Sequence, residues 1–173
     1  MSCNKIPSRI MQADYAGDYS VYQNAVYQLY LKTFSEKQFY YNGKPIHEKL
    51  QPKVSGMSCT FWHIVSSGAD EEHKLPDFNR YETVAWPGFI LEYCLSNCSS
   101  VLQWKNTRST TKRIAKRVLL FCPEIDYLVV LEEREDYYLF WTAYPVNHEH
   151  VRNKLMKEYM QYKNSLENAS SAT

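Results

Sequence analysis

The sequence lacks any apolar run long enough to cross a membrane, which excludes a transmembrane helix of about 20 apolar residues. Its first residues, MSCNKIPSRIMQADY, lack the continuous hydrophobic segment of a secretory signal, so we expect a cytoplasmic protein with no membrane partner. The net charge is only +1. The chain as a whole therefore has no bias toward nucleic acid, and any such binding requires a local basic patch.

Cysteine pairs and the common catalytic motifs are also missing. The five cysteines are odd in number and form no C-x-x-C pair, so neither a disulfide framework nor a zinc knuckle is indicated. The sequence has no Gly-rich phosphate loop, no Walker pattern, no HExxH and no GxSxG. We expect structural thiols, no metal site and no cofactor.

The length and the aromatic content fit one folded domain. We expect a single domain over residues 18–166, with a loosely held arm over residues 1–17 and a frayed tail over residues 167–173. The 15 Tyr, 7 Phe and 4 Trp suit either a half-solvated binding face or a sheet-rich core, and composition leaves both open.

Two β-prone runs, over residues 127–132 and 137–144, predict a hairpin around the charged tip at residues 133–136. Because side chains alternate between the two faces of a strand, one face of the second run is predicted to form the floor of a polar substrate site. Its residues are Tyr138, Phe140, Thr142 and Tyr144. The opposite face, which should bury against a helix, consists of Tyr137, Leu139, Trp141 and Ala143. Glu132 and Glu133 should be solvated charges near the tip rather than a carboxylate pair.

The remaining pattern predicts an α+β fold. Helices are expected from a cap at Asp18 to about residue 34, over residues 80–95 with a break at Pro87, and after Asn147. Strands are expected over residues 38–41, 59–65, 101–104 and 112–121, with an irregular segment over residues 43–57. This order predicts an antiparallel meander sheet with the N-terminal, central and C-terminal helices packed on one face.

A local basic run stands out against the neutral total. The segment from residue 105 to 117 contains no acid, and its basic residues are Lys105, Arg108, Lys112, Arg113, Lys116 and Arg117. Such density attracts phosphates and predicts an RNA-binding segment. It fits equally well a solvated edge strand that is protected from aggregation by charge.

His63 follows Trp62 in an otherwise apolar run, where a lone histidine is more often a core residue than a catalyst. A histidine can nevertheless exchange protons with a ribose hydroxyl or a leaving alkoxide, and an arginine can take the growing charge on a phosphate. Thr142 can hold a phosphate oxygen, and Tyr144 can donate or orient. These functions together suffice to cleave RNA by attack of the 2′-hydroxyl, without a metal.

Five pieces of the chain resemble one family of metal-independent nucleases. In order they are FWHIVSSG (61–68), DFNRYETVAWP (77–87), Trp104, PEIDYLVVLEER (123–134) and WTAYPV (141–146). The family is the phage-associated branch of the barnase, EndoU, colicin-tRNase and RelE (BECR) superfold, and the similarity spans roughly residues 37 to 160.

The resemblance implies a BECR/RelE-like fold and an endoribonuclease of toxin or phage-defence type that leaves a 2′,3′-cyclic phosphate. It implies that His63 transfers protons and that Thr142 and Tyr144 face the scissile phosphate. Either Arg80 or Arg117 would stabilise the phosphorane. The implied partners are RNA, with tRNA among the candidates, and a neutralising antitoxin or inhibitor protein.

A second reading from the residues is a non-catalytic binding module. In that reading the 105–117 segment and the Tyr-rich sheet hold nucleic acid or a protein, and His63 is structural. The two readings differ in one respect that a structure addresses. A nuclease needs His63, Thr142, Tyr144 and an arginine gathered around a cleft, whereas a binding module would bury His63 away from any opening.

Overall fold

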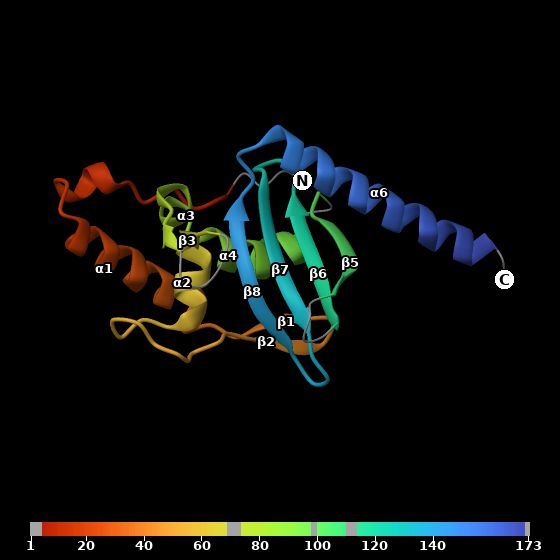
Figure 1. Ribbon diagram of the computed structural model, residues 1–173, viewed down its shortest axis with the longest axis horizontal. Coiled ribbons are helices and arrows are strands. Elements are labelled where there is room, and N and C mark those ends of the chain that lie inside the picture. Colours follow the sequence, from red (N-terminus) through yellow and green to blue (C-terminus); the bar gives the residue numbers. More distant parts are fainter. Residues whose placement is uncertain (1–4, 69–73, 98–99, 110–113, 172–173) are drawn as a thin grey trace.

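The computed structural model describes residues 5–68, 74–97, 100–109 and 114–171. They form an α+β fold around a mixed, mostly antiparallel six-stranded sheet (Figure 1). In sheet order the strands are β1 (Phe39–Tyr41), β2 (Lys44–His47), β8 (Tyr138–Pro145), β7 (Tyr127–Glu133), β6 (Ile114–Cys122) and β5 (Leu102–Ser109). The predicted hairpin is confirmed as β7 and β8, at the centre of the sheet.

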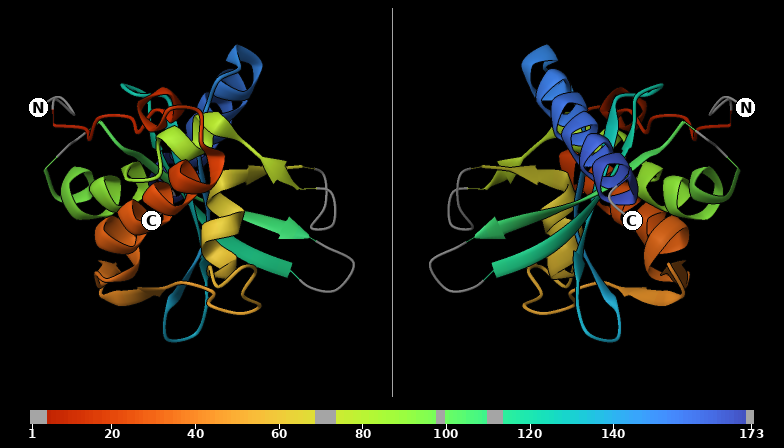
Figure 2. Two further views of the ribbon diagram at one scale, coloured as in Figure 1. Left: turned by 90° about the vertical axis from the view of Figure 1, so that its left-hand side faces the viewer. Right: turned by 90° about the vertical axis from the view of Figure 1, so that its right-hand side faces the viewer.

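The helical segments fall between and around these strands. They are η1 (Gln12–Tyr15), α1 (Tyr19–Tyr30), η2 (Leu31–Ser35), α2 (Cys59–Val65), α3 (Phe78–Glu82), α4 (Trp86–Phe89), η3 (Ile90–Cys94), α5 (Leu95–Asn97) and α6 (Glu149–Ser171). A separate two-stranded sheet pairs β3 (Ser66–Ser67) with β4 (Leu75–Pro76). In Figure 2 this small sheet extends on the same side of the molecule as β5 and β6.

Several predicted boundaries shift. Asp18 caps α1 as predicted, because its carboxylate accepts a hydrogen bond from the Val21 amide at 3.1 Å. The central helical region is split into α3, α4, η3 and α5, with Pro87 in the first turn of α4. The segment predicted to be irregular contains β2, and β5 continues well past residue 104 to Ser109.

The helices lie on both faces of the sheet. Buried side chains of α1 to α4 form a first core on the face where Val118, Leu120 and Val129 point. Among the described helices only α6 packs on the other face, against Trp104 and Leu119. The prediction that all helices share one face is wrong, because β6 and β7 are apolar on both sides and need a layer on each.

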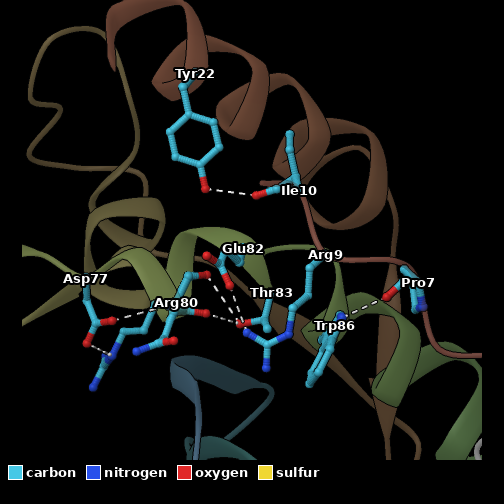
Figure 3. Close-up of polar contacts among 10 residues, drawn as sticks. Pro7, Arg9, Ile10, Tyr22, Asp77, Arg80, Glu82, Thr83 and Trp86 are labelled. Atoms are coloured by element: carbon cyan, nitrogen blue, oxygen red, sulfur yellow. Dashed lines mark hydrogen bonds and ion pairs between the residues drawn. The ribbon is translucent and has the colours of Figure 1, made fainter. Parts of the chain in front are cut away.

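Residues 5–17, predicted as a loosely held arm, are tied to the helices of the first core (Figure 3). The Trp86 indole donates to the Pro7 carbonyl at 2.9 Å, and the Ile10 amide donates to the Glu82 carbonyl at 3.0 Å. The Tyr22 hydroxyl donates to the Ile10 carbonyl at 2.9 Å. This segment therefore links α1 to α3 and α4.

Helix α6 runs for 23 residues to Ser171, beyond residue 167, where the sequence predicts fraying. Val151, Leu155 and Tyr159 of α6 pack on the second core, whereas Leu166 is exposed. Neither α6 nor any other helix in the described ranges is both long and apolar enough to cross a bilayer.

Gly88 marks the tightest approach between α4 and η2. A Cβ atom at this position would lie 2.1 Å from the Thr33 carbonyl oxygen. We therefore expect Gly88→Ala to lower the free energy of unfolding by about 3 kcal/mol through overpacking. The control is Gly56→Ala, which has open space around it and costs only its left-handed backbone, about 1 kcal/mol. Urea denaturation measures both, and equal losses would contradict the close packing.

Because of the buried tyrosines, the free energy of unfolding varies with pH in the alkaline range. Burial, with a further contribution from Glu82, raises the pKa of Tyr22 to about 12, and burial also raises the pKa of Tyr81 and of Tyr127. The unfolded chain releases these protons near pH 10 and the folded chain holds them. The stability that the protonated phenols contribute is therefore fully present below pH 10. It is lost as the pH rises toward the pKa values that these phenols have in the folded chain.

We expect the urea midpoint to be level from pH 8 to 9.5 and to fall between pH 10 and 11. Each such tyrosine removes up to about 1.4 kcal/mol per pH unit. In Tyr22→Phe the urea midpoint should fall less steeply with pH, because one of the titrating tyrosines is missing. A midpoint that stays constant to pH 11 would show that the phenols titrate normally in the fold.

Candidate active site

The candidate site lies along the outer edge of β8. Strand β2 pairs with this edge through only Tyr138 and Leu139. Beyond them α2 and α3 contact β8 in place of a strand (Figure 1). The residues predicted to be catalytic come from α2 (His63), α3 (Arg80), β6 (Arg117) and β8 (Thr142, Tyr144).

The segment that carries His63 is a helix, and the predicted strand over residues 59–65 is wrong. The Ser58 hydroxyl caps the helix by accepting a hydrogen bond from the Phe61 amide at 3.2 Å. Phe61, Ile64 and Val65 then share a buried face at helical spacing. A run of seven mostly apolar residues satisfies strand and helix patterns alike, and here the cap decides. His63 itself is half-buried.

The carbonyl groups at the end of α2 bind side chains from β8 and α3. The last turn of a helix leaves its carbonyl oxygens without internal partners. The His63 carbonyl accepts from Thr142 Oγ1 at 3.4 Å and from Arg80 Nη1 at 3.5 Å. The Ser66 carbonyl accepts from the same Nη1 at 2.9 Å. The backbone of His63 is thus joined directly to both neighbouring elements.

A β-bulge determines which side chains of β8 face the site. The pairing of β7 with β8 skips Trp141, which is an extra residue on β8. Beyond it the alternation shifts by one residue. Ala143 therefore follows Phe140 into the first core, and Tyr144 packs on the side of α6. The prediction that Phe140 shares a face with Thr142 and Tyr144 is wrong, whereas Thr142 and Tyr144 do share one. Of the opposite face that was predicted to be buried, Ala143 is fully buried, whereas Tyr137, Leu139 and Trp141 are only half-buried.

Trp141 joins His63 to Arg117. The imidazole lies edge-on to the indole, with 6.1 Å between ring centroids, and the Arg117 guanidinium lies 4.5 Å from the centroid of the indole. His63 and Trp141 also line a cavity of about 270 Å³ together with Lys49 and Thr60. The imidazole therefore lies beside an opening with a cation nearby, rather than in the core.

Glu132 is buried between two arginines. Its side chain is 1% exposed, and its carboxylate lies 2.6 Å from Arg134 Nη2 and 3.7 Å from Arg117 Nε. The prediction of a solvated charge is wrong for Glu132, because β7 continues to Glu133 and the two arginines compensate the buried carboxylate. The ion pair holds Arg117 against the face of Trp141.

Arg80 and Tyr144 form the second part of the site. The guanidinium lies 4.8 Å from the centroid of the Tyr144 ring, and its Nε lies 3.5 Å from an Asp77 carboxylate oxygen (Figure 3 shows the latter pair). Burial raises the pKa of Tyr144, although Arg80 and Arg108 partly oppose this, so the phenol stays protonated at neutral pH. Burial lowers the pKa of Arg80, and the Asp77 carboxylate opposes this shift by raising it. The guanidinium remains charged at neutral pH.

Of the predicted residues, Thr142 and Arg80 meet at the backbone carbonyl of His63, and the set does not gather around the single cleft that the nuclease reading required. The His63 side chain lines the first cavity, whereas Arg80 and Tyr144 line a second cavity of about 280 Å³ with Asp77 and His148. Thr142, whose hydroxyl binds the His63 carbonyl, lies at the junction of the two.

The predicted RNA-binding residues are more dispersed. Lys105 Nζ lies 3.4 Å from Glu133, and Arg108 Nη2 lies 3.9 Å from Glu158, so acids from other elements accompany the basic run. Lys116 is exposed on the opposite face of β6 from Arg117. Lys112 and Arg113 lie outside the described residues.

Trp141 and Glu132 are the site residues that sequence reasoning missed. The role of Trp141 depends on the bulge, which has no glycine or proline to signal it in the sequence. The burial of Glu132 depends on Arg117, its cross-strand neighbour 15 residues earlier in the chain. The apolar run of β7 leading directly into Glu132 was the available signal.

No protein-family model, no curated protein and no solved structure matches this chain. Functional inference therefore rests on the sequence motifs and on the arrangement around β8.

The ion pairs of Glu132 give a stability prediction. In Glu132→Gln a neutral amide would face two arginines in a buried place, and we expect a loss of about 2 kcal/mol in the free energy of unfolding. Glu133→Gln is the matched control, because its partner Lys105 is exposed and the pair should contribute less than about 0.5 kcal/mol. Equal urea midpoints for the two variants would show that the Glu132 cluster adds no stability.

Proposed function

We propose that this chain is a metal-independent endoribonuclease that cleaves RNA by attack of the 2′-hydroxyl on the adjacent phosphate, leaving a 2′,3′-cyclic phosphate. The observation that carries the proposal is the joining of Thr142 and Arg80 at the His63 carbonyl. This contact joins the backbone of His63 to a hydroxyl and a guanidinium from two other segments at one edge of the sheet.

In the proposed reaction the His63 imidazole exchanges protons with the ribose hydroxyl or the leaving alkoxide. The protonated Tyr144 phenol donates a hydrogen bond to a phosphate oxygen. Thr142 is a positioning residue in this proposal. Its hydroxyl donates to the His63 carbonyl, which fixes the end of α2 against β8.

Two arginines supply positive charge at the candidate site, one beside Tyr144 and one beside Trp141. Each is anchored by one carboxylate: Arg80 by Asp77, and Arg117 by Glu132. Anchoring holds a guanidinium at a fixed place before the substrate arrives, which favours stabilisation of charge that develops on a phosphorane. We assign this role to Arg80 or Arg117.

The resemblance to phage-associated BECR nucleases supports a toxin or phage-defence role in the cytoplasm. It also supports RNA, including tRNA, as the substrate and a neutralising antitoxin or inhibitor protein as a partner. The binding-module alternative receives less support. Lys105, Arg108 and Arg117 each contact an acidic side chain, and His63 lines a cavity.

Total RNA incubated with the purified chain in excess EDTA tests the proposal. We expect cleavage that leaves cyclic phosphate ends. His63→Ala should reduce the rate roughly a hundredfold or more, because it removes the proton-transfer group. His150→Ala is the matched control, since this histidine is exposed at the start of α6 and should leave the rate unchanged.

Intact RNA, with the chain shown by mass spectrometry to be free of a co-purified inhibitor, would overturn the proposal. RNA binding without cleavage would then favour the binding module. Cleavage that disappears in EDTA would show that a metal is required and that these residues do not carry the reaction.

A further inference from the structure

The groove between β5 and α6 differs in chemistry from the cavities beside β8. Helix α6 starts next to the end of β8 and passes the β5 edge of the sheet (Figure 1). The groove has a volume of about 400 Å³. Its principal side chains are Trp104, Asn106, Arg108, Glu158, Gln161 and Tyr162.

Two polar atoms at this groove are buried and unsatisfied. Trp104 Nε1 is a donor and Asn106 Oδ1 is an acceptor, and within the described ranges neither has a hydrogen-bond partner. Trp104 is 2% exposed, and the two residues share one face of β5 because they are two apart. Native proteins leave few buried polar groups unpaired, and a bound ligand is one way to satisfy them.

A carboxylate and aromatic rings complete the surroundings. Glu158 accepts from Asn106 Nδ2 at 3.4 Å, and its other oxygen lies 3.9 Å from Arg108 Nη2. The ring of Tyr159 packs edge-on to Trp104, with 6.0 Å between centroids. The groove, whose aromatic lining residues are Trp104 and Tyr162, therefore combines an N–H donor and oxygen acceptors with aromatic rings. Proteins that bind single-stranded RNA hold unpaired bases with this combination.

We propose that this groove binds one unpaired nucleobase of the RNA substrate and prefers the keto bases guanine and uracil to adenine and cytosine. The inference rests on the proposed ribonuclease function. A keto base presents a carbonyl oxygen beside a ring N–H, so the carbonyl accepts from Trp104 Nε1 and the ring N–H donates to Glu158 or to Asn106 Oδ1. Adenine and cytosine present a ring-nitrogen lone pair at that position, which the Glu158 carboxylate repels.

The groove and the candidate active site are close enough for one RNA strand to occupy both. Trp104 of the groove and Tyr144 of the candidate site pack against the same apolar cluster on the α6 side of the sheet. In this proposal the bound base therefore belongs to the same RNA strand as the scissile phosphate.

Short single-stranded RNAs that differ in one base beside the cleaved bond test the preference. We expect the unaltered chain to cleave keto-base substrates at least tenfold faster than the others, measured as kcat/KM. Glu158→Gln should reduce this ratio to about threefold or less, mainly by lowering KM for adenine and cytosine. Trp104→Phe keeps a ring and removes the donor, and should also reduce the ratio. Glu167→Gln, the same change in an exposed pair further along α6, should leave the ratio unchanged.

Cleavage without a keto preference, or with the same preference in Glu158→Gln and Trp104→Phe, would overturn the groove assignment and leave the ribonuclease proposal standing. If the chain cleaves no RNA, binding of 2′-O-methyl oligonucleotides decides the matter by fluorescence polarisation. A keto preference that requires Glu158 would support the groove while the proposed function fails, and binding without such a preference would overturn both.

Discussion

The end of α2 is the constraint on which the candidate site depends. A helix of seven residues has few internal hydrogen bonds, and its last carbonyl oxygens require partners from elsewhere. Thr142 and Arg80 supply those partners, so the same contacts that complete the helix also bring β8 and α3 to His63. The hydrogen bonds that satisfy the last carbonyl oxygens of α2 are therefore the same ones that assemble the site. A change that loosens α2 also loosens its contacts with β8 and α3.

The extra residue on β8 has a comparable effect on the other side of the site. If Trp141 were paired in regular alternation, without a bulge, Tyr144 would share the face of Phe140 and turn toward the first core. The bulge instead directs Tyr144 to the side of α6 and sets the indole between His63 and Arg117. One inserted residue thus distributes aromatic side chains over both cavities, where they contact the cations that the proposed chemistry requires.

The sequence predicted the elements with strong local signals and missed those decided by distant contacts. The cap at Asp18 and the hairpin of β7 and β8 follow from residues adjacent in the chain, and both were correct. The segment around His63 was assigned to a strand because its composition favours both structures, and the Ser58 cap was overlooked. The apolar run of β7 leads into Glu132, but the arginine that compensates its buried charge comes from the neighbouring strand, and the pairing of the two strands is not local in sequence. The residues chosen for the site lie along β8, but His63 lines one cavity whereas Arg80 and Tyr144 line another.

Helix α6 is the only helix in the described ranges that covers the second apolar face of the sheet. If α6 detached, Trp104, Phe121 and Val130 would be exposed to solvent together. The first core would stay closed, because it is built from other helices and from the opposite face of the sheet. Local opening of α6 would therefore expose an apolar patch capable of self-association without global unfolding.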